Sequence, residues 1–282
     1  MRGPHIIVRT LSRAAVPDKF GNVWQYHSRS DRHSKVACWG MLFDLLRHSK
    51  VLQDQVSRRI VGFGINHEMR DFRTARKKNL DLVLCTPGAA GMDRRFTFAE
   101  LVDEYELELS AVERKDLLTL PPLSRVDVGS VHVALEAKAC MTAHIKALPR
   151  LYDEMNSSHG AIHGSADFAI AAGFAMVNFS DSFISPGLNT WRIGRRKAIV
   201  SQLRQPDDTI RTIEKLKEIP RRAAQNTDGF DALGIVIVRM ANDGTPVEIV
   251  GREPAPNSGD PWHYDQMIRR IASLFATKFG NL

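Results

Sequence analysis

The chain has 282 residues, of which 43% are hydrophobic, so it is long enough to bury one large core or two modest ones. It carries 39 lysine and arginine residues against 32 acidic residues, and the formal net charge of +7 is compatible with a polyanionic partner. Because the sequence has no run of about 18 apolar residues and no apolar signal core near its start, we expect a soluble, cytoplasmic protein without a membrane partner.

The first 34 residues are polar and irregular in pattern, and we expect residues 1–34 to form an N-terminal basic arm. At the end of this segment and just beyond it, a single acid, Asp31, is surrounded by Arg29, Arg32, His33 and Lys35. Such a cluster fits a contact with phosphates, and it fits a solvated loop before a helix equally well.

The segment from residue 35 to residue 180 alternates between helical and strand patterns. Its apolar periodicity predicts first a long helix over about 35–59 and strands over 60–65 and 80–84. An insertion over about 86–129, with a helix inside it, is expected next. The pattern then predicts a strand over 131–139, a helix over 141–156, a loop over 157–165 and a buried central strand over 168–179. The order is therefore helix, strand, strand, strand, helix and strand, which indicates the α/β class.

Residues 181–282 are interpreted as a C-terminal extension of the same domain. Their pattern predicts a helix over about 207–219, a β-hairpin whose strands 233–240 and 246–250 flank the turn signal Asn242-Asp243-Gly244, and a final amphipathic helix over about 264–279.

Three charged side chains interrupt apolar strands. Asp81 lies within the run LDLVL and Glu136 within VALEAKA, where a charge is costly unless it has a purpose. Residues i and i+2 of a strand share a face, so Lys138 lies beside Glu136. Two carboxylates on adjacent strands suit Mg²⁺, and an adjacent ammonium stabilises charge that develops on a phosphate. The pattern predicts phosphodiester hydrolysis, with all three residues catalytic and the two acids as metal ligands.

Asp81, followed by Glu136-Ala137-Lys138 at the end of an apolar strand and then by a helix and another strand, resembles the PD-(D/E)XK nuclease superfamily, to which restriction endonucleases belong. The resemblance covers roughly residues 35–180 and implies a restriction-endonuclease-like αβββαβ core with a mixed central sheet flanked by helices. It also implies a single nuclease domain over residues 35–282 that acts as a Mg²⁺-dependent endonuclease of restriction or phage-defence type, with Mn²⁺ as a substitute. The sequence lacks the proline that the family often has before the aspartate, and its interval between the two acids is long.

The expected partner is double-stranded DNA, and analogy with double-strand cutters of the family suggests a homodimer. Cations expected to contact the DNA backbone come from the basic arm, the helix after the catalytic strand and a cationic turn: Arg29, Arg32, Lys35, Lys146, Arg195, Arg196 and Lys197. Arg150 follows Lys146 by four residues and shares its helix face, although both also fit ordinary surface charges. Glu68, as an additional metal ligand, and His144 are accessory candidates.

Several alternatives stay open on the sequence alone. A catalytically silent nucleic-acid-binding module on the same fold would retain the DNA contacts without hydrolysis, and a structural protein would have neither. Glu136 and Lys138 also fit an ion pair at a sheet rim. Cys140 and His144 have the i, i+4 spacing of a zinc pair, but a buried thiol beside a helix histidine is the favoured interpretation. His159 and His163 are assigned to the loop, where they either contact substrate or face solvent.

Overall fold

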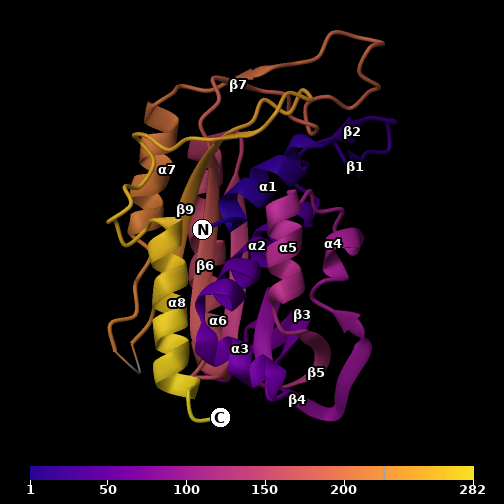
Figure 1. Cartoon of the computed structure of the whole chain (residues 1–282). Helices are drawn as coiled ribbons and strands as arrows, with labels where there is room; N and C mark the ends of the chain where they lie inside the picture. The colour runs from indigo at the N-terminus through magenta and orange to yellow at the C-terminus, as the bar shows by residue number, and fades with distance from the viewer. Residues whose placement is uncertain (225–226) are drawn as a thin grey trace.

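The computed structural model describes residues 1–224 and 227–282, and the side chains of residues 90–95 fall outside the described part. Its main strands are β3 (Gly62–Arg70), β4 (Lys77–Thr97), β5 (Ser124–Cys140), β6 (Ile170–Asn178), β9 (Ala232–Arg239) and β10 (Glu248–Ile249). Among the described residues these strands form a six-stranded sheet in the order β10-β9-β6-β5-β3-β4, in which β4 also pairs with β5 (Figure 1). The expected α/β class with a mixed central sheet is confirmed.

The pairing of the strands fixes where their ends meet. β4 runs antiparallel to β3 and to β5, with Leu82 opposite Leu135. Helix α6 (His144–Ser165) then carries the chain back, so that β6 lies parallel to β5. Every residue of β6 is buried, as expected for the predicted central strand of small residues. The observed order from residue 32 to residue 178 includes the predicted succession of helix, three strands, helix and strand.

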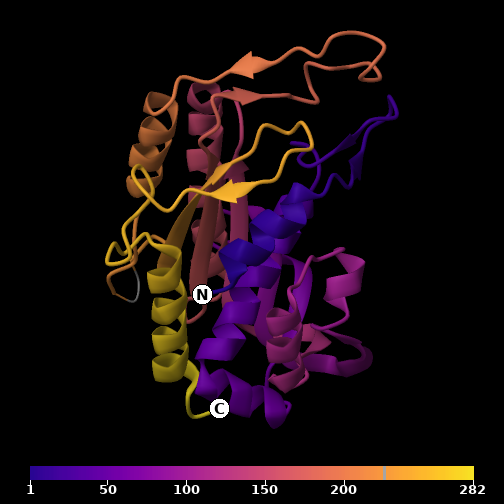
Figure 2. The same cartoon turned by 45° about the horizontal axis from the view of Figure 1, so that its top comes forward.

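Helices cover both faces of the sheet (Figure 2). The core on one face contains buried residues from α1 (Gly3–Ser12), α2 (Arg32–His48) and α8 (Tyr264–Phe279). The core on the other face contains buried residues from α6 and from α7 (Asp207–Lys217). Helices α3 (Lys50–Ser57), α4 (Leu101–Glu104) and α5 (Ala111–Thr119) and the short pairs β1 (Val16–Pro17) with β2 (Val23–Trp24) and β7 (Ser182–Phe183) with β8 (Ser201–Gln202) complete the described elements. None of the described helices is both long and apolar enough to cross a membrane.

The expectation of an irregular arm over residues 1–34 is wrong for its first part, because Gly3–Ser12 forms α1. Ile6, Ile7 and Leu11 are fully buried against the core. The fully buried carboxylate of Asp44 accepts hydrogen bonds from the first backbone amides of this helix, at 2.6 Å from Gly3 N, and so holds it on α2. The apolar side of this helix is short, and the surrounding polar residues obscured it in the sequence.

Other predicted boundaries also need correction. The helix expected over 35–59 is broken at Ser49, whose extended backbone ends α2 and whose side chain accepts a hydrogen bond from Leu52 N to begin α3. β4 and β5 extend into the two ends of the insertion expected over 86–129, and its predicted helix is two helices, α4 and α5. Ser110 begins α5 with a reciprocal capping box.

The loop expected over 157–165 is instead the second half of α6. Glycine at 160 and 164 suggested a loop, but Gly164 is needed for a close approach, because a Cβ there would lie 2.1 Å from Asp71 Oδ1. In the C-terminal extension, the predicted hairpin is confirmed by the antiparallel pairing of β9 with β10, and the predicted final helix is confirmed as α8.

Candidate active site

Asp81 lies at an interruption in the pairing of β4 with β3. The ladder passes from Leu82 opposite Ile65 to Leu80 opposite His67, and Asn66 between them has a positive φ of 51°. Asp81 Oδ2 accepts a hydrogen bond of 3.0 Å from the backbone amide of Ala137. The carboxylate of Asp81 therefore contacts the backbone of β5 at Ala137, the residue between Glu136 and Lys138.

Glu136 and Lys138 share one face of β5, as the i, i+2 spacing predicted. Lys138 Nζ lies 2.7 Å from Glu136 Oε1, and Lys78 Nζ lies 3.7 Å from the same oxygen. Glu136 is only 1% exposed, and its other oxygen, Oε2, accepts no hydrogen bond from the described residues. A buried carboxylate oxygen without a donor is costly, because it has left water without gaining a hydrogen bond from the protein.

Burial disfavours ionisation of both acids, and for Glu136 the charge of Asp81 adds to this effect. Burial raises the pKa of Asp81, against the hydrogen bond from Ala137 and the charge of Lys138, which lower it. Burial raises the pKa of Glu136 as well, and the negative charge of Asp81 raises it further. Burial alone would lower the pKa of Lys138, but the neighbouring Glu136 carboxylate outweighs that effect and raises it. The site therefore combines two carboxylates of raised pKa with Lys138, whose raised pKa keeps its amine protonated at neutral pH.

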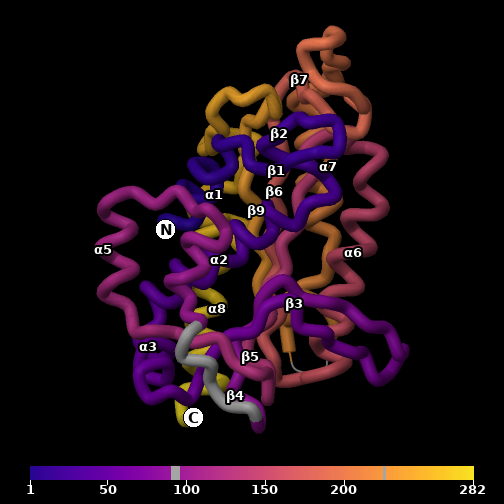
Figure 3. Tube along the Cα trace, turned by 90° about the vertical axis from the view of Figure 1, so that its right-hand side faces the viewer, coloured from indigo at the N-terminus to yellow at the C-terminus, as the bar shows by residue number. Residues whose placement is uncertain are grey.

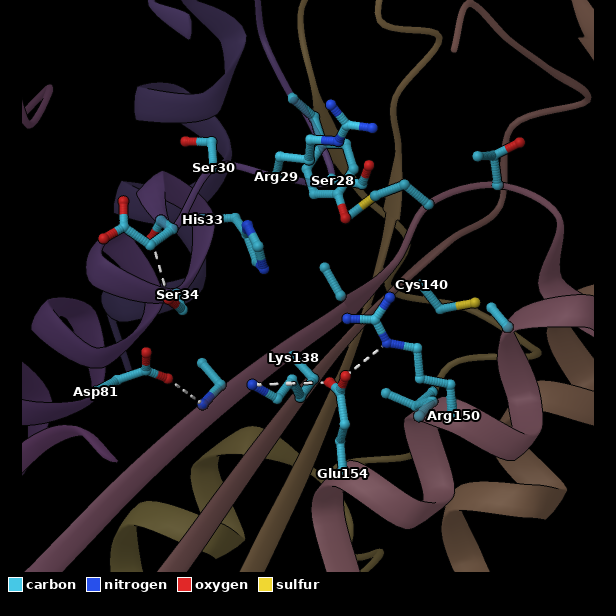
Figure 4. A pocket seen from close by; sticks show the side chains of 18 residues that line it. Ser28, Arg29, Ser30, His33, Ser34, Asp81, Lys138, Cys140, Arg150 and Glu154 are labelled. Atoms are coloured by element: carbon cyan, nitrogen blue, oxygen red, sulfur yellow. Dashed lines mark hydrogen bonds and ion pairs between the residues drawn. The ribbon is translucent and has the colours of Figure 1, made fainter. Parts of the chain in front are cut away.

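A cavity of about 400 Å³ opens beside Asp81 and Lys138. Its walls come from the segment that leads into α2, from the end of β5 and from the first half of α6. In Figure 4, His33 and Ser34 lie on one side of Lys138, and Arg150 and Glu154 lie on the other. Burial and the charge of Lys138 lower the pKa of His33 to about 4, so this side chain adds no charge to the wall at neutral pH.

Glu154 and Lys78 were not predicted from the sequence, but both contact the charged side chains of the site. Glu154 Oε2 lies 3.9 Å from Lys138 Nζ, and Glu154 Oε1 accepts a 2.6 Å hydrogen bond from Arg150 Nε. The i, i+4 spacing of Arg150 and Glu154 on a helix was a usable signal. Lys78 could not be distinguished from the other residues of the basic run around it, because its partner Glu136 is distant along the chain. Charges of alternating sign therefore lead from Lys78 through Lys138 to the exposed Arg150.

Within the described residues, no group of three or more histidine, cysteine, aspartate or glutamate side chains is arranged to hold a metal ion. Asp81 and Glu136 are two carboxylates, and Mg²⁺ is commonly bound through one or two carboxylates, with water and substrate oxygens in its other positions. The undonated Oε2 of Glu136 and the repulsion between the two acids fit a hard cation at this place. In residue type, Asp81 and Glu136 therefore match the one or two carboxylates by which Mg²⁺ is commonly bound.

The accessory candidates lie away from this pair. Glu68 is half exposed, pairs with Lys77 at 2.7 Å and does not line the cavity. His144 is buried, and its Nε2 donates to the carbonyl oxygen of Asn178 at 2.9 Å, which ties the start of α6 to the end of β6. Cys140 is a buried free thiol whose pKa burial raises to about 12. His144 therefore has a structural contact, and no zinc-binding group forms around it among the described residues.

The two histidines assigned to a loop are buried in α6 instead. His159 Nε2 donates a 3.0 Å hydrogen bond to Asn156 Oδ1 on the same helix. His163 donates from Nε2 to the Gly229 carbonyl at 3.1 Å and accepts at Nδ1 from Arg222 at 2.8 Å. Their expected exposure is therefore wrong, because the helix continues past the glycines and turns both rings inward.

The predicted DNA-contacting cations fall into three groups. Arg29 is exposed at the cavity, but Arg32 donates to the Thr10 carbonyl at 2.9 Å and Lys35 pairs with Asp31 at 3.0 Å. Lys146 is exposed on α6. A third group, Arg195, Arg196 and Lys197, is exposed on the loop between β7 and β8.

That cationic loop is held by side-chain contacts. Asn22, next to β2, accepts from Ile193 N at 2.8 Å and donates to the Trp191 carbonyl at 2.9 Å. The guanidinium of Arg196 lies over the Trp191 ring, 5.8 Å from its centroid. In Figures 1 and 2, the loop and the β1–β2 hairpin extend from the same end of the molecule.

Comparison with known proteins gave no match: no protein-family model, curated protein or solved structure is significantly similar to the chain.

Proposed function

We propose that the protein is a metal-dependent endodeoxyribonuclease that hydrolyses phosphodiester bonds, with Asp81, Glu136 and Lys138 as its catalytic residues. The proposal is carried by two contacts at the β4–β5 junction: Asp81 accepts a hydrogen bond from the Ala137 amide, and Glu136 and Lys138, on either side of Ala137, form an ion pair. Asp81 and Lys138 also line the open cavity. Two carboxylates and an ammonium are the groups that this chemistry requires of a protein.

Asp81 and Glu136 would hold Mg²⁺, or Mn²⁺ in its place, and the bound ion would supply a Lewis acid and lower the pKa of water. Lys138 has two roles in this scheme: its ammonium balances Glu136 in the free protein and offsets negative charge on the phosphate in the transition state. The Ala137 amide fixes one oxygen of Asp81, so the orientation of this carboxylate is set before substrate arrives.

A restriction-endonuclease-like core is part of the proposal. The succession of α2, β3, β4, β5, α6 and β6 supports it, as do the antiparallel β3–β4–β5 pairing and the parallel β5–β6 pairing. In such a core, the acids come from the second and third strands, which here are β4 and β5. The extensions beyond residue 180 would then supply substrate contacts.

The proposed substrate is double-stranded DNA in the cytoplasm, cut by a homodimer in a restriction or phage-defence role. The net charge of +7 and the exposed cations Arg29, Arg195, Arg196 and Lys197 support a polyanionic substrate, because each phosphate contact releases counterions. A homodimer would present two sites, one to each strand.

A catalytically silent nucleic-acid-binding module is the second candidate. One observation favours it: Glu136 is already neutralised by Lys138 and Lys78, so the protein satisfies much of this charge without a metal. The unpartnered Oε2 of Glu136 favours the catalytic proposal instead.

The test is a cleavage assay on supercoiled plasmid and linear duplex DNA, run with an excess of Mg²⁺ and, in parallel, with an excess of EDTA. We expect cutting with Mg²⁺, no cutting with EDTA, and no cutting by Asp81→Asn or Glu136→Gln. Glu68→Gln is the matched control, because it removes an exposed carboxylate that pairs only at the surface, with Lys77. Cutting by all variants, or by none of the proteins including wild type, would count against the proposal.

A further inference from the structure

The turn between β3 and β4 presents an aromatic side chain among cations. Residues 70–78 contain five basic residues and one acid. Phe72, within this turn, is 74% exposed, and Arg70 and Arg76 on either side of it are exposed as well. A single exposed apolar residue is ordinary on a protein surface. What matters here is how the turn is held and what lies beside it.

The backbone of the turn is anchored although the phenyl ring is not. Asp71 is buried and accepts hydrogen bonds from Arg73 N at 2.9 Å and from Thr74 Oγ1 at 2.6 Å. Phe72 N donates to the carbonyl of Gly164 near the end of α6 at 3.2 Å. The absence of a side chain at Gly164 allows this approach, because a Cβ would clash with Asp71. The ring is therefore exposed to solvent on a backbone that is already held in place, so a ligand would have to order only the side chain.

A groove lies between this turn and α6, next to the candidate active site. It has a volume of about 600 Å³ and is lined by Asp71, Thr74 and Arg76 at the turn and by one side of α6. Glu154 lines both this groove and the cavity that contains Lys138. In Figure 3, the β3–β4 turn lies beside the lower end of α6, and the helix runs up from it. The groove therefore borders the turn and is adjacent to the cavity, with which it shares Glu154.

The groove carries a positive charge at the turn and negative charge along α6. Arg76 is exposed at the turn, whereas Asp153 presents an exposed carboxylate on α6. Glu154 is balanced by Arg150, and Asp71 by its hydrogen bonds and by Arg73. A polyanionic strand would accordingly keep its phosphates toward the turn and away from Asp153.

We infer that the β3–β4 turn guides a DNA strand into the cavity, with Phe72 stacked on a base and with Arg70 and Arg76 on the neighbouring phosphates. The inference rests on the proposed function in taking DNA as the polymer. Stacking on a phenyl ring requires a base face that no neighbouring base covers. Such a face comes either from a single-stranded segment or from a duplex step that the protein opens by inserting the ring. The base recognised is thus an unstacked one in both cases.

The experiment measures DNA affinity in EDTA, where no metal-dependent cleavage occurs. The probes are a single-stranded oligonucleotide carrying one 2-aminopurine and the duplex of the same sequence, and the 2-aminopurine fluorescence reports base stacking. We expect Phe72→Ala to weaken binding about ten-fold and to remove the fluorescence change. Phe72→Trp should retain both. The control is Phe168→Ala, which removes another exposed phenyl ring, 66% exposed, that lies outside the basic β3–β4 turn.

The two probes separate the sources of the base. A loss confined to the single strand supports an unpaired segment, and a loss on the duplex as well supports an opened step. Wild-type affinity and fluorescence for Phe72→Ala on both probes would overturn the inference. If that variant also cuts DNA normally with Mg²⁺, the proposed function stands and only the role of the turn fails. If wild type binds DNA through Phe72 but never cuts, the role of the turn stands and the proposed catalysis fails.

Discussion

Replacing Asp81 with asparagine should make the folded protein more stable in the absence of metal. Burial raises the pKa of Asp81 and of Glu136, so ionising these groups costs folding free energy at neutral pH. Asparagine keeps an oxygen that can accept from the Ala137 amide, but it removes one of the two repelling charges. The variant should therefore unfold at a higher temperature than wild type at pH 7 to 8.

The direction of the pH dependence follows from the raised pKa. Between the ordinary and the raised pKa of Asp81, the folded state binds more protons than the unfolded state, so the contribution of this residue to stability falls as pH rises. Below the ordinary pKa, both states are protonated and the penalty disappears. The stability advantage of Asp81→Asn should accordingly be largest above the raised pKa and should shrink as the pH falls toward about 4.

Magnesium should stabilise the wild-type protein and leave the stability of Asp81→Asn unchanged. A ligand at 100 times its dissociation constant stabilises the folded state by about 2.7 kcal/mol. With an unfolding entropy of about 2.1 cal/mol/K per residue over 282 residues, this corresponds to an increase of about 4 to 5 °C in melting temperature. We expect that increase for wild type and for Glu68→Gln, and none for Asp81→Asn.

Differential scanning fluorimetry across a Mg²⁺ titration, at pH values from 4 to 8, measures both effects. An equal Mg²⁺ response in wild type and Asp81→Asn would refute the assignment of this carboxylate as a ligand. A lower melting temperature for the variant without metal would refute the reasoning about its buried charge.

Two further predictions concern the DNA contacts and the fold. Arg195→Glu together with Arg196→Glu should weaken DNA binding and reduce the slope of log affinity against log salt by about one unit per lost phosphate contact. Arg114→Glu with Lys115→Glu, on α5, is the control and should have a smaller effect. Salt titrations of affinity measure both, and equal effects would contradict the prediction. Gly164→Ala should lower the free energy of unfolding by about 1 to 3 kcal/mol, because its Cβ would lie 2.1 Å from Asp71 Oδ1. Gly160→Ala, where a Cβ meets open space on the same helix, should stabilise α6 by up to about 1 kcal/mol, and chemical denaturation compares the two.

The sequence was informative where one pattern dominated a whole element. The final helix has strong amphipathic spacing and matches α8 at both ends, and the small apolar residues of β6 predicted a buried strand. The i, i+2 spacing placed Glu136 and Lys138 on one face because a strand has a fixed period of two. These inferences depend only on local geometry.

Contacts between distant segments could not be predicted in the same way. Nothing local to Asp81 indicates that it accepts from the Ala137 amide, because this contact depends on the β4–β5 register. Glu154 joins the site only because α6 packs across β5. Similarly, the glycines of α6 suggested a loop, but Gly164 serves a tertiary contact with the β3–β4 turn. In each case, tertiary packing decided what local propensity left open.

The most direct test of the catalytic assignment is the single-turnover rate of DNA cleavage by Lys138→Ala, measured with Mg²⁺ at saturating protein beside its DNA affinity. Lys138 Nζ lies 2.7 Å from Glu136 Oε1 and borders the cavity, so its ammonium should act on the transition state more than on bound DNA. We predict a rate at least about 100-fold below wild type, with nearly unchanged affinity. Cleavage at the wild-type rate would contradict the catalytic role of Lys138 and would favour the silent DNA-binding module.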